Sequence, residues 1–176
     1  AFSLRYEAGA AAGFDNALGT YRIAGDGTIS DVRIAFESSK AAMAGDTFDV
    51  GVLPAGSTLG FFLVQDAPAF EQEGETLAEV IATADSFEFL QDGSGANAFD
   101  ATVPTFVADG NGFAGAAIHH STPDMNIEGA VQMLSGATTD EGGRLFIGVE
   151  DLSALQTNDF DFNDMVFSVE TSLVFV

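Results

Sequence analysis

The sequence predicts an all-β fold, an antiparallel β-sandwich of jelly-roll type, in which residues 1–176 form a single domain. Short apolar runs end in turn residues about every dozen positions, a spacing typical of sandwiches and barrels. Glycine occurs 20 times and phenylalanine 17 times, whereas helical spacing of apolar residues is rare. Asp-Gly and Asn-Gly pairs, which adopt the positive φ angles of tight turns, separate several of the runs. No segment has the length or composition of a linker between domains.

The expected strands combine β-branched or aromatic residues with flanking turn residues. They span 2–7, 19–24, 28–37, 47–53, 58–65, 86–91, 102–108, 115–121, 129–134, 144–150 and 165–176. Within 28–37 strict alternation puts Val32, Ile34 and Phe36 on one face, and it puts Ile29, Asp31, Arg33 and Ala35 on the other. One short helix is expected over 75–84, where apolar residues recur at helical spacing. The segment 91–100 is expected to be a loop, and the turn pairs are Asp26-Gly27, Asp92-Gly93, Asp109-Gly110 and Asn111-Gly112.

The charge balance excludes several classes of partner. The chain has 27 acidic and 5 basic residues, a formal net charge of −22. Nucleic acid is excluded because phosphate contacts need Lys and Arg, and an anionic membrane surface is excluded for the same reason. A hydrophobic content of 47% rules out a disordered acidic tail, and no segment is long enough to insert into a membrane as a helix. Cysteine is absent, so the chain has no disulfide and no thiolate site.

One short loop collects five oxygen-bearing side chains directly before an apolar run. It reads NDFDFND and contains Asn158, Asp159, Asp161, Asn163 and Asp164. Strand-like alternation would direct the oxygens to one side and anchor Phe160 and Phe162 in the core. Crowded carboxylates repel one another unless protons or a cation neutralise them, and hard oxygen ligands favour Ca²⁺. An EF-hand is rejected, because Asp164 takes the sixth position, where that loop needs glycine.

Catalytic interpretations find little support in the sequence. His119 and His120 are adjacent, so on a strand they point to opposite faces and cannot easily bind one ion. His120, Asp124 and Asn126 are a candidate ligand or secondary site, although a hydrogen-bonded structural histidine is the favoured interpretation. No nucleophile elbow or phosphate-binding loop is present, and no tryptophan is available to stack on a sugar. The sequence therefore predicts a protein that is not an enzyme.

The C-terminal segment LFIGVEDLSALQTNDFDFNDMVFSV (145–169) resembles the DUF4114 family, β-rich domains of large secreted or surface-attached bacterial proteins. The similarity lies in a strand, a Glu-Asp pair, an Asp-rich element and a final strand; the link LSALQTN is longer and less glycine-rich than is usual in the family. Weaker similarity covers 16–29, 53–65 and 118–134, where Gln132 replaces a frequent second histidine. The resemblance implies a calcium-binding β-sandwich, with Ca²⁺ held by Asp159, Asp161, Asp164, Asn163, Glu150 and Asp151.

Three functions are open on this basis. The first is a non-enzymatic calcium-binding module of an extracellular or cell-surface bacterial protein, in which the ion stabilises the acidic loop and the chain is one part of a larger multidomain protein. The second is a calcium-dependent adhesin or lectin-type module that binds a carbohydrate or a peptide at an open coordination position. The third is a hydrolase that uses His120 and neighbouring carboxylates.

Overall fold

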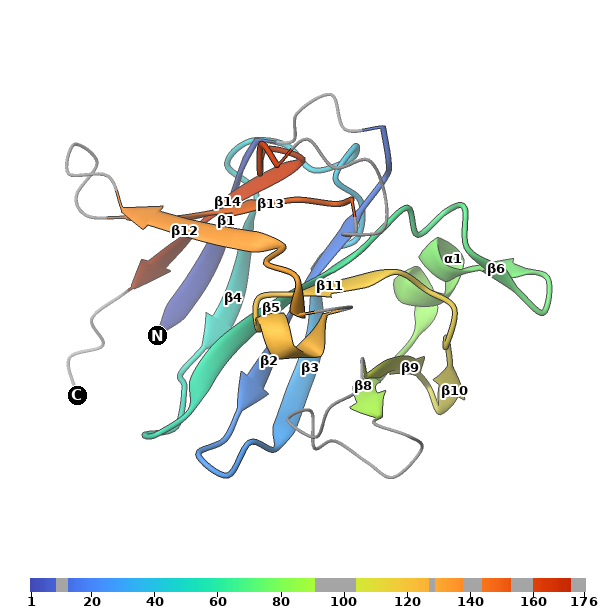
Figure 1. Ribbon diagram of the computed structural model, residues 1–176, viewed down its shortest axis with the longest axis horizontal. Helices are drawn as coiled ribbons and strands as arrows, with labels where there is room; N and C mark the ends of the chain where they lie inside the picture. Colours follow the sequence, from blue (N-terminus) through green and yellow to red (C-terminus); the bar gives the residue numbers. More distant parts are fainter. Residues whose placement is uncertain (9–12, 91–103, 127–128, 138–143, 153–159, 172–176) are drawn as a thin grey trace.

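The computed structural model describes residues 1–176 except 9–12, 91–103, 127–128, 138–143, 153–159 and 172–176. It is an antiparallel β-sandwich with one short α-helix, as the sequence predicts (Figure 1). One sheet has five strands in the order β12-β13-β14-β1-β4, and the other has seven in the order β10-β9-β8-β3-β2-β5-β11. No helix within the described part of the chain is long and apolar enough to span a bilayer.

The five-stranded sheet joins the two ends of the sequence, because β1 pairs with β14 along nearly its whole length. Its strands are β1 (Phe2–Ala8), β4 (Thr47–Gly51), β12 (Met133–Ala137), β13 (Leu145–Val149) and β14 (Met165–Thr171). The strand expected over 129–134 is displaced toward the C-terminus in β12, and 172–176 lies outside the described residues.

The seven-stranded sheet contains the middle of the chain. Its strands are β2 (Ala17–Ile23), β3 (Ile29–Phe36), β5 (Thr58–Val64), β8 (Phe87–Leu90), β9 (Thr105–Ala108), β10 (Asn111–Gly112) and β11 (Ile118–His120). The described pairing of β8 with β3 is the single pair Val32↔Phe87, so β8, β9 and β10 turn away from the rest of the sheet. The pair Asn111-Gly112 belongs to β10, and the turn before it is Asp109-Gly110, with φ of 47° and 80°.

The centre of the seven-stranded sheet, at β2 and β5, is buried on both faces, which explains the apolar run of β5. Phe61 and Leu63 face the five-stranded sheet and form an inter-sheet core with residues such as Phe167. Phe62 and Val64 point the other way into an aromatic core, which includes Tyr21, Phe89, Phe106 and Phe113. Successive strand residues point to opposite faces, so a strand with two covered faces is apolar at every position.

The aromatic core is covered by the curled end of the sheet and by α1 (Leu77–Thr83), which follows the small hairpin of β6 (Glu71–Gln72) and β7 (Glu75–Thr76). The helix begins at Thr76, whose hydroxyl accepts the amide of Glu79 while the Glu79 carboxylate accepts the amide of Thr76, a capping box. Leu77 and Ile81 are its buried residues. A 3₁₀ turn, η1 (Pro123–Met125), follows β11.

The alternation predicted for β3 is wrong at both ends of the strand. Phe36 packs in the inter-sheet core and not with Val32 and Ile34, because the register with β2 shifts between Leu18 and Gly19. Asp31 has φ of 53°, and the register with β2 shifts between Thr20 and Arg22. This bulge adds one residue to the strand, so Ile29 and Val32 both point into the aromatic core although three positions separate them.

Candidate metal centre

Two antiparallel strands bring two carboxylates together by their register alone. β13 ends at Val149 and β14 begins at Met165, and these two residues are paired. Glu150 directly follows the first strand and Asp164 directly precedes the second, so both lie at the same end of the sheet. The loop that joins the strands supplies Asp161. The three residues form the one cluster of potential metal ligands found among the described residues.

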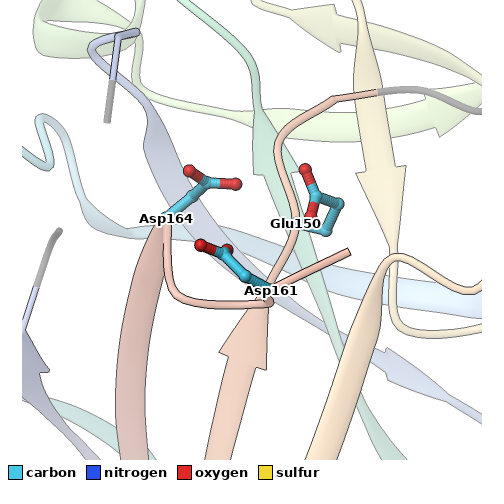
Figure 2. A group of neighbouring side chains, drawn as sticks. All are labelled: Glu150, Asp161 and Asp164. Atoms are coloured by element: carbon cyan, nitrogen blue, oxygen red, sulfur yellow. The ribbon is translucent and has the colours of Figure 1, made fainter. Parts of the chain in front are cut away.

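The carboxylates of Glu150, Asp161 and Asp164 turn toward a common space (Figure 2). Each offers an oxygen that lies within 4.8 Å of the oxygens offered by the other two. Glu150 is fully buried, Asp164 is half-buried and Asp161 is exposed. The cluster therefore extends from the protein interior at Glu150 to the solvent-exposed side chain of Asp161.

Hydrogen bonds orient each of the three carboxylates. Asp164 accepts the backbone amide of Asp151 at 2.9 Å, and Glu150 accepts that of Leu152 at 3.2 Å. Asp161 accepts both the backbone amide and the side-chain amide of Asn163, at 3.2 and 2.6 Å. A carboxylate offers about four acceptor positions, so these bonds leave capacity for a cation.

The loop is coiled and does not continue the strand. Phe160 and Phe162 have φ of 55° and 51°, in the left-handed region, where strand alternation does not apply. The prediction that both rings anchor the loop in the core is wrong for Phe160, which is 64% exposed. The carbonyl of Phe162 instead lies against Gly148, where a Cβ atom would be 2.3 Å from that oxygen. Gly148 is therefore the position that allows the loop to cross β13.

A second set of buried contacts fixes the residues next to Glu150. Asp151 is 3% exposed, and its carboxylate accepts the side-chain amide of Asn16 at 2.7 Å. The Gln132 amide donates to the Leu152 carbonyl at 2.7 Å. The Glu150 amide in turn donates to the Gln132 carbonyl at 2.9 Å. Gln132, which directly precedes β12, thus holds the backbone at Glu150 and Leu152, and Asn16, which directly precedes β2, holds the side chain of Asp151.

Charge repulsion within the cluster is substantial. Two unit charges 4.8 Å apart repel by roughly 3.5 kcal/mol at an effective dielectric constant of 20. The carboxylate oxygens are at or within that separation. A bound cation would remove this cost, whereas a solvated acidic loop would relieve it by moving the side chains apart.

The other predicted ligands have different positions. Asp159 lies outside the described residues. Asn163 is exposed, and its side-chain nitrogen donates to the Asp161 carboxylate. Asp151 bonds to Asn16 and is not among the three clustered carboxylates.

The candidate secondary site does not present an imidazole to solvent. His120 is fully buried among aromatic rings, at 4.9 Å from Phe89 and 5.7 Å from Tyr21 between ring centroids. Asn126 is buried and bonds to the backbone of His120 in both directions, whereas Asp124 is exposed. Burial, with a smaller contribution from the neighbouring His119, lowers the pKa of His120 to about 3.

His119 points to the opposite face, as the strand geometry requires. Its Nδ1 lies 3.1 Å from the side-chain nitrogen of Gln132, next to the contacts that hold the acidic loop. Burial lowers the pKa of His119 to about 4, partly opposed by a hydrogen bond with the backbone of Asp151. Both histidines are therefore neutral at pH 7.

Sequence reasoning missed Asn16, Gln132 and Gly148. Asn16 is 135 residues from the carboxylate it contacts, and no local pattern marks such a pair. Gly148 alone carried a signal, since an isolated glycine inside a strand often marks a close backbone approach.

A family model described as "Domain of unknown function (DUF4114)" matches residues 53–172. This range contains β5 and every strand that follows it, and it includes all three clustered carboxylates. Comparisons with curated proteins and with solved structures gave no match.

Proposed function

Because the chain belongs to the DUF4114 family, whose function is unknown, we propose its function from the site: a calcium-binding β-sandwich module without enzymatic activity. The observation that carries the proposal is the convergence of Glu150, Asp161 and Asp164 at the paired ends of β13 and β14. In this proposal the ion is structural, and it links the acidic loop to the end of β13 and the start of β14.

The donor set favours calcium over other metals. All three side chains offer carboxylate oxygens, which are the hard ligands that Ca²⁺ takes in six- to eight-fold coordination. Zinc and copper sites need the imidazole or thiolate groups that this cluster lacks, because both histidines lie elsewhere and the chain has no cysteine. Mg²⁺ demands a tighter octahedron than a coiled loop with an exposed Asp161 provides.

Calcium-linked stability tests the proposal. A ligand that binds only the folded state adds RT ln(1 + [L]/Kd), about 2.7 kcal/mol at a hundredfold excess over Kd. We expect CaCl₂ to raise the melting temperature far more than NaCl of equal ionic strength. Asp161→Ala should lose most of the response, whereas Glu88→Ala, an exposed carboxylate in β8, should keep it.

General screening of the net charge of −22 is the competing explanation for any effect of salt. It predicts equal responses to CaCl₂ and NaCl at matched ionic strength, and equal responses in the two variants. Either result would remove the support for a specific site. Isothermal titration calorimetry with Ca²⁺ then gives the stoichiometry directly.

A second candidate function rests on the exposed rim of the cluster. Phe160 is 64% exposed and directly precedes Asp161 in the sequence, and Asp161 is also exposed. Calcium-dependent adhesin modules bind sugar hydroxyls or carboxylates at open coordination positions, and aromatic rings stack on sugars. Glycan and peptide arrays run with calcium and with EGTA would separate this candidate from a purely structural ion.

We also propose an extracellular or cell-surface location for the protein. An extracellular or cell-surface position supplies the millimolar calcium that a loop of weak, partly exposed ligands needs. The high negative charge also fits a saline or calcium-rich medium, which screens it.

We expect a hydrolase screen to find no turnover. Activity that disappears in His120→Ala with the fold intact would refute the non-enzymatic assignment.

A further inference from the structure

The strand β12 is an edge of the five-stranded sheet, and no described strand lies beyond it (Figure 1). Edge strands expose backbone groups that another chain can pair with, and proteins usually block them with charges, prolines, bulges or covering segments. The edges of this protein differ sharply in this respect.

Three other described edges are blocked or very short. On β11 the side chain of Asn126 accepts the His120 amide at 2.6 Å and donates to the His120 carbonyl at 2.8 Å, as a neighbouring strand would. On β4 the guanidinium of Arg33 donates to the carbonyls of Asp49 and Val50. The strand β10 has only two residues.

Among the described residues, none of these devices occurs at the edge of β12. It pairs with β13 in continuous register over five residues, without a bulge. The segment 129–139 around it contains no charged residue and no proline, in a chain with 27 acidic residues. Residues 134–137 are exposed, and no residue of β12 makes a further hydrogen bond to another described residue.

The ladder shows which backbone groups point outward. The Glu150 amide donates to the Gln132 carbonyl, so that pair is hydrogen-bonded. Because hydrogen-bonded and non-hydrogen-bonded pairs alternate, Leu134 and Gly136 bond to β13. Met133, Ser135 and Ala137 therefore direct their N–H and C=O groups away from the sheet.

We propose that β12 is a docking edge that adds one extended segment of another polypeptide to the five-stranded sheet. Three outward residues in regular register provide alternating donors and acceptors, the pattern that β-strand addition uses. Leu134 is 50% exposed and its cross-strand partner is Gly148, so the partner strand gains an apolar contact there.

The negative net charge of the protein favours partner segments that are neutral or basic. A protein of net charge −22 repels acidic segments, so the added strand carries neutral or basic side chains with an apolar residue at alternate positions. A second copy of the chain is disfavoured, because two molecules that each carry a net charge of −22 repel each other.

A phage-displayed library of random heptapeptides, selected on the whole chain in the presence of calcium, tests the proposal. The discriminating variant is Ser135→Pro, which removes an outward N–H and leaves the β12–β13 ladder intact. Its matched control is Ser135→Thr, which keeps the N–H. Melting temperatures establish that both variants fold, and Ala137→Pro replaces Ser135→Pro if the latter does not.

We expect selected peptides to alternate apolar with polar or basic residues. Their affinity should fall at least about tenfold in Ser135→Pro, equivalent to about 1.4 kcal/mol, and stay unchanged in Ser135→Thr. The proposal is overturned if no peptide is selected or if selected peptides bind Ser135→Pro equally well. It is also overturned if the wild type self-associates and Ser135→Pro abolishes this, since a second copy would then occupy the edge.

Discussion

Acid should destabilise this protein through its two buried histidines. Burial lowers the pKa of His120 to about 3 and that of His119 to about 4, whereas an unfolded chain binds the proton near pH 6.5. Between these values the unfolded state holds protons that the folded state excludes. The stabilising contribution is therefore complete above pH 6.5 and is lost as the pH falls toward the folded pKa values.

The size of the effect follows from the pKa differences. Each histidine lowers the free energy of unfolding by about 1.4 kcal/mol per pH unit below pH 6.5, which amounts to about 2 kcal/mol at pH 5. The pair removes about 4 kcal/mol of a total that is about 5–15 kcal/mol in ordinary domains. For a chain of this length the melting temperature should fall by about 10 °C.

The variant His120→Leu isolates one half of this effect. Neither ring nitrogen of His120 has a hydrogen-bond partner, so an apolar side chain of similar size should leave the stability at pH 8 nearly unchanged. Urea unfolding followed by circular dichroism at pH 8 and pH 5, with EGTA present, gives the loss for each protein. The loss should be about 2 kcal/mol smaller in the variant, because carboxylate protonation cancels in the comparison. An equal loss in both proteins would refute the reasoning.

Three substitutions test the packing around the site and the helix. Gly148→Ala should lower the melting temperature and weaken its response to calcium, because the new Cβ atom would clash with the carbonyl of Phe162. The control Gly136→Ala should change neither quantity, because no atom lies within 4 Å of the new Cβ atom. Asn16→Ala should lower the free energy of unfolding by about 1–3 kcal/mol in urea denaturation, because the buried Asp151 carboxylate loses a hydrogen-bond donor. A loss near zero would contradict a stabilising role for this bond. Thr76→Ala should cost about 1 kcal/mol through the lost helix cap, and an unchanged denaturation midpoint would contradict the capping box as a stabilising element.

The parts of the fold that depend on local patterns could be predicted from the sequence. The apolar run of β5, the Asp109-Gly110 turn and the helix near residue 77 each follow from periodicity or turn chemistry within a few residues. The proximity of Glu150 and Asp164 follows from the resemblance and from the antiparallel pairing of the two strands that these residues flank.

The remaining features depend on contacts or conformations that no local pattern encodes. Asp31 and Phe160 adopt left-handed φ angles although neither is glycine, so simple alternation put neighbouring side chains on the wrong faces. The Asn16–Asp151 bond joins opposite parts of the chain. The resemblance predicts Asp151 as a metal ligand, and no local pattern marks the contact of its carboxylate with Asn16.

The pairing of β1 with β14 determines how the protein responds to tension. Phe2 lies opposite Thr171, so a force applied through these residues peels the two strands apart one residue pair after another and does not load all their hydrogen bonds together. Resistance to such peeling is low at first. It would rise where the separation reaches Met165, since the acidic loop and any ion it holds lie just beyond. Single-molecule pulling through these two residues should therefore show a weak initial rupture, then a stronger one that calcium reinforces and EGTA removes.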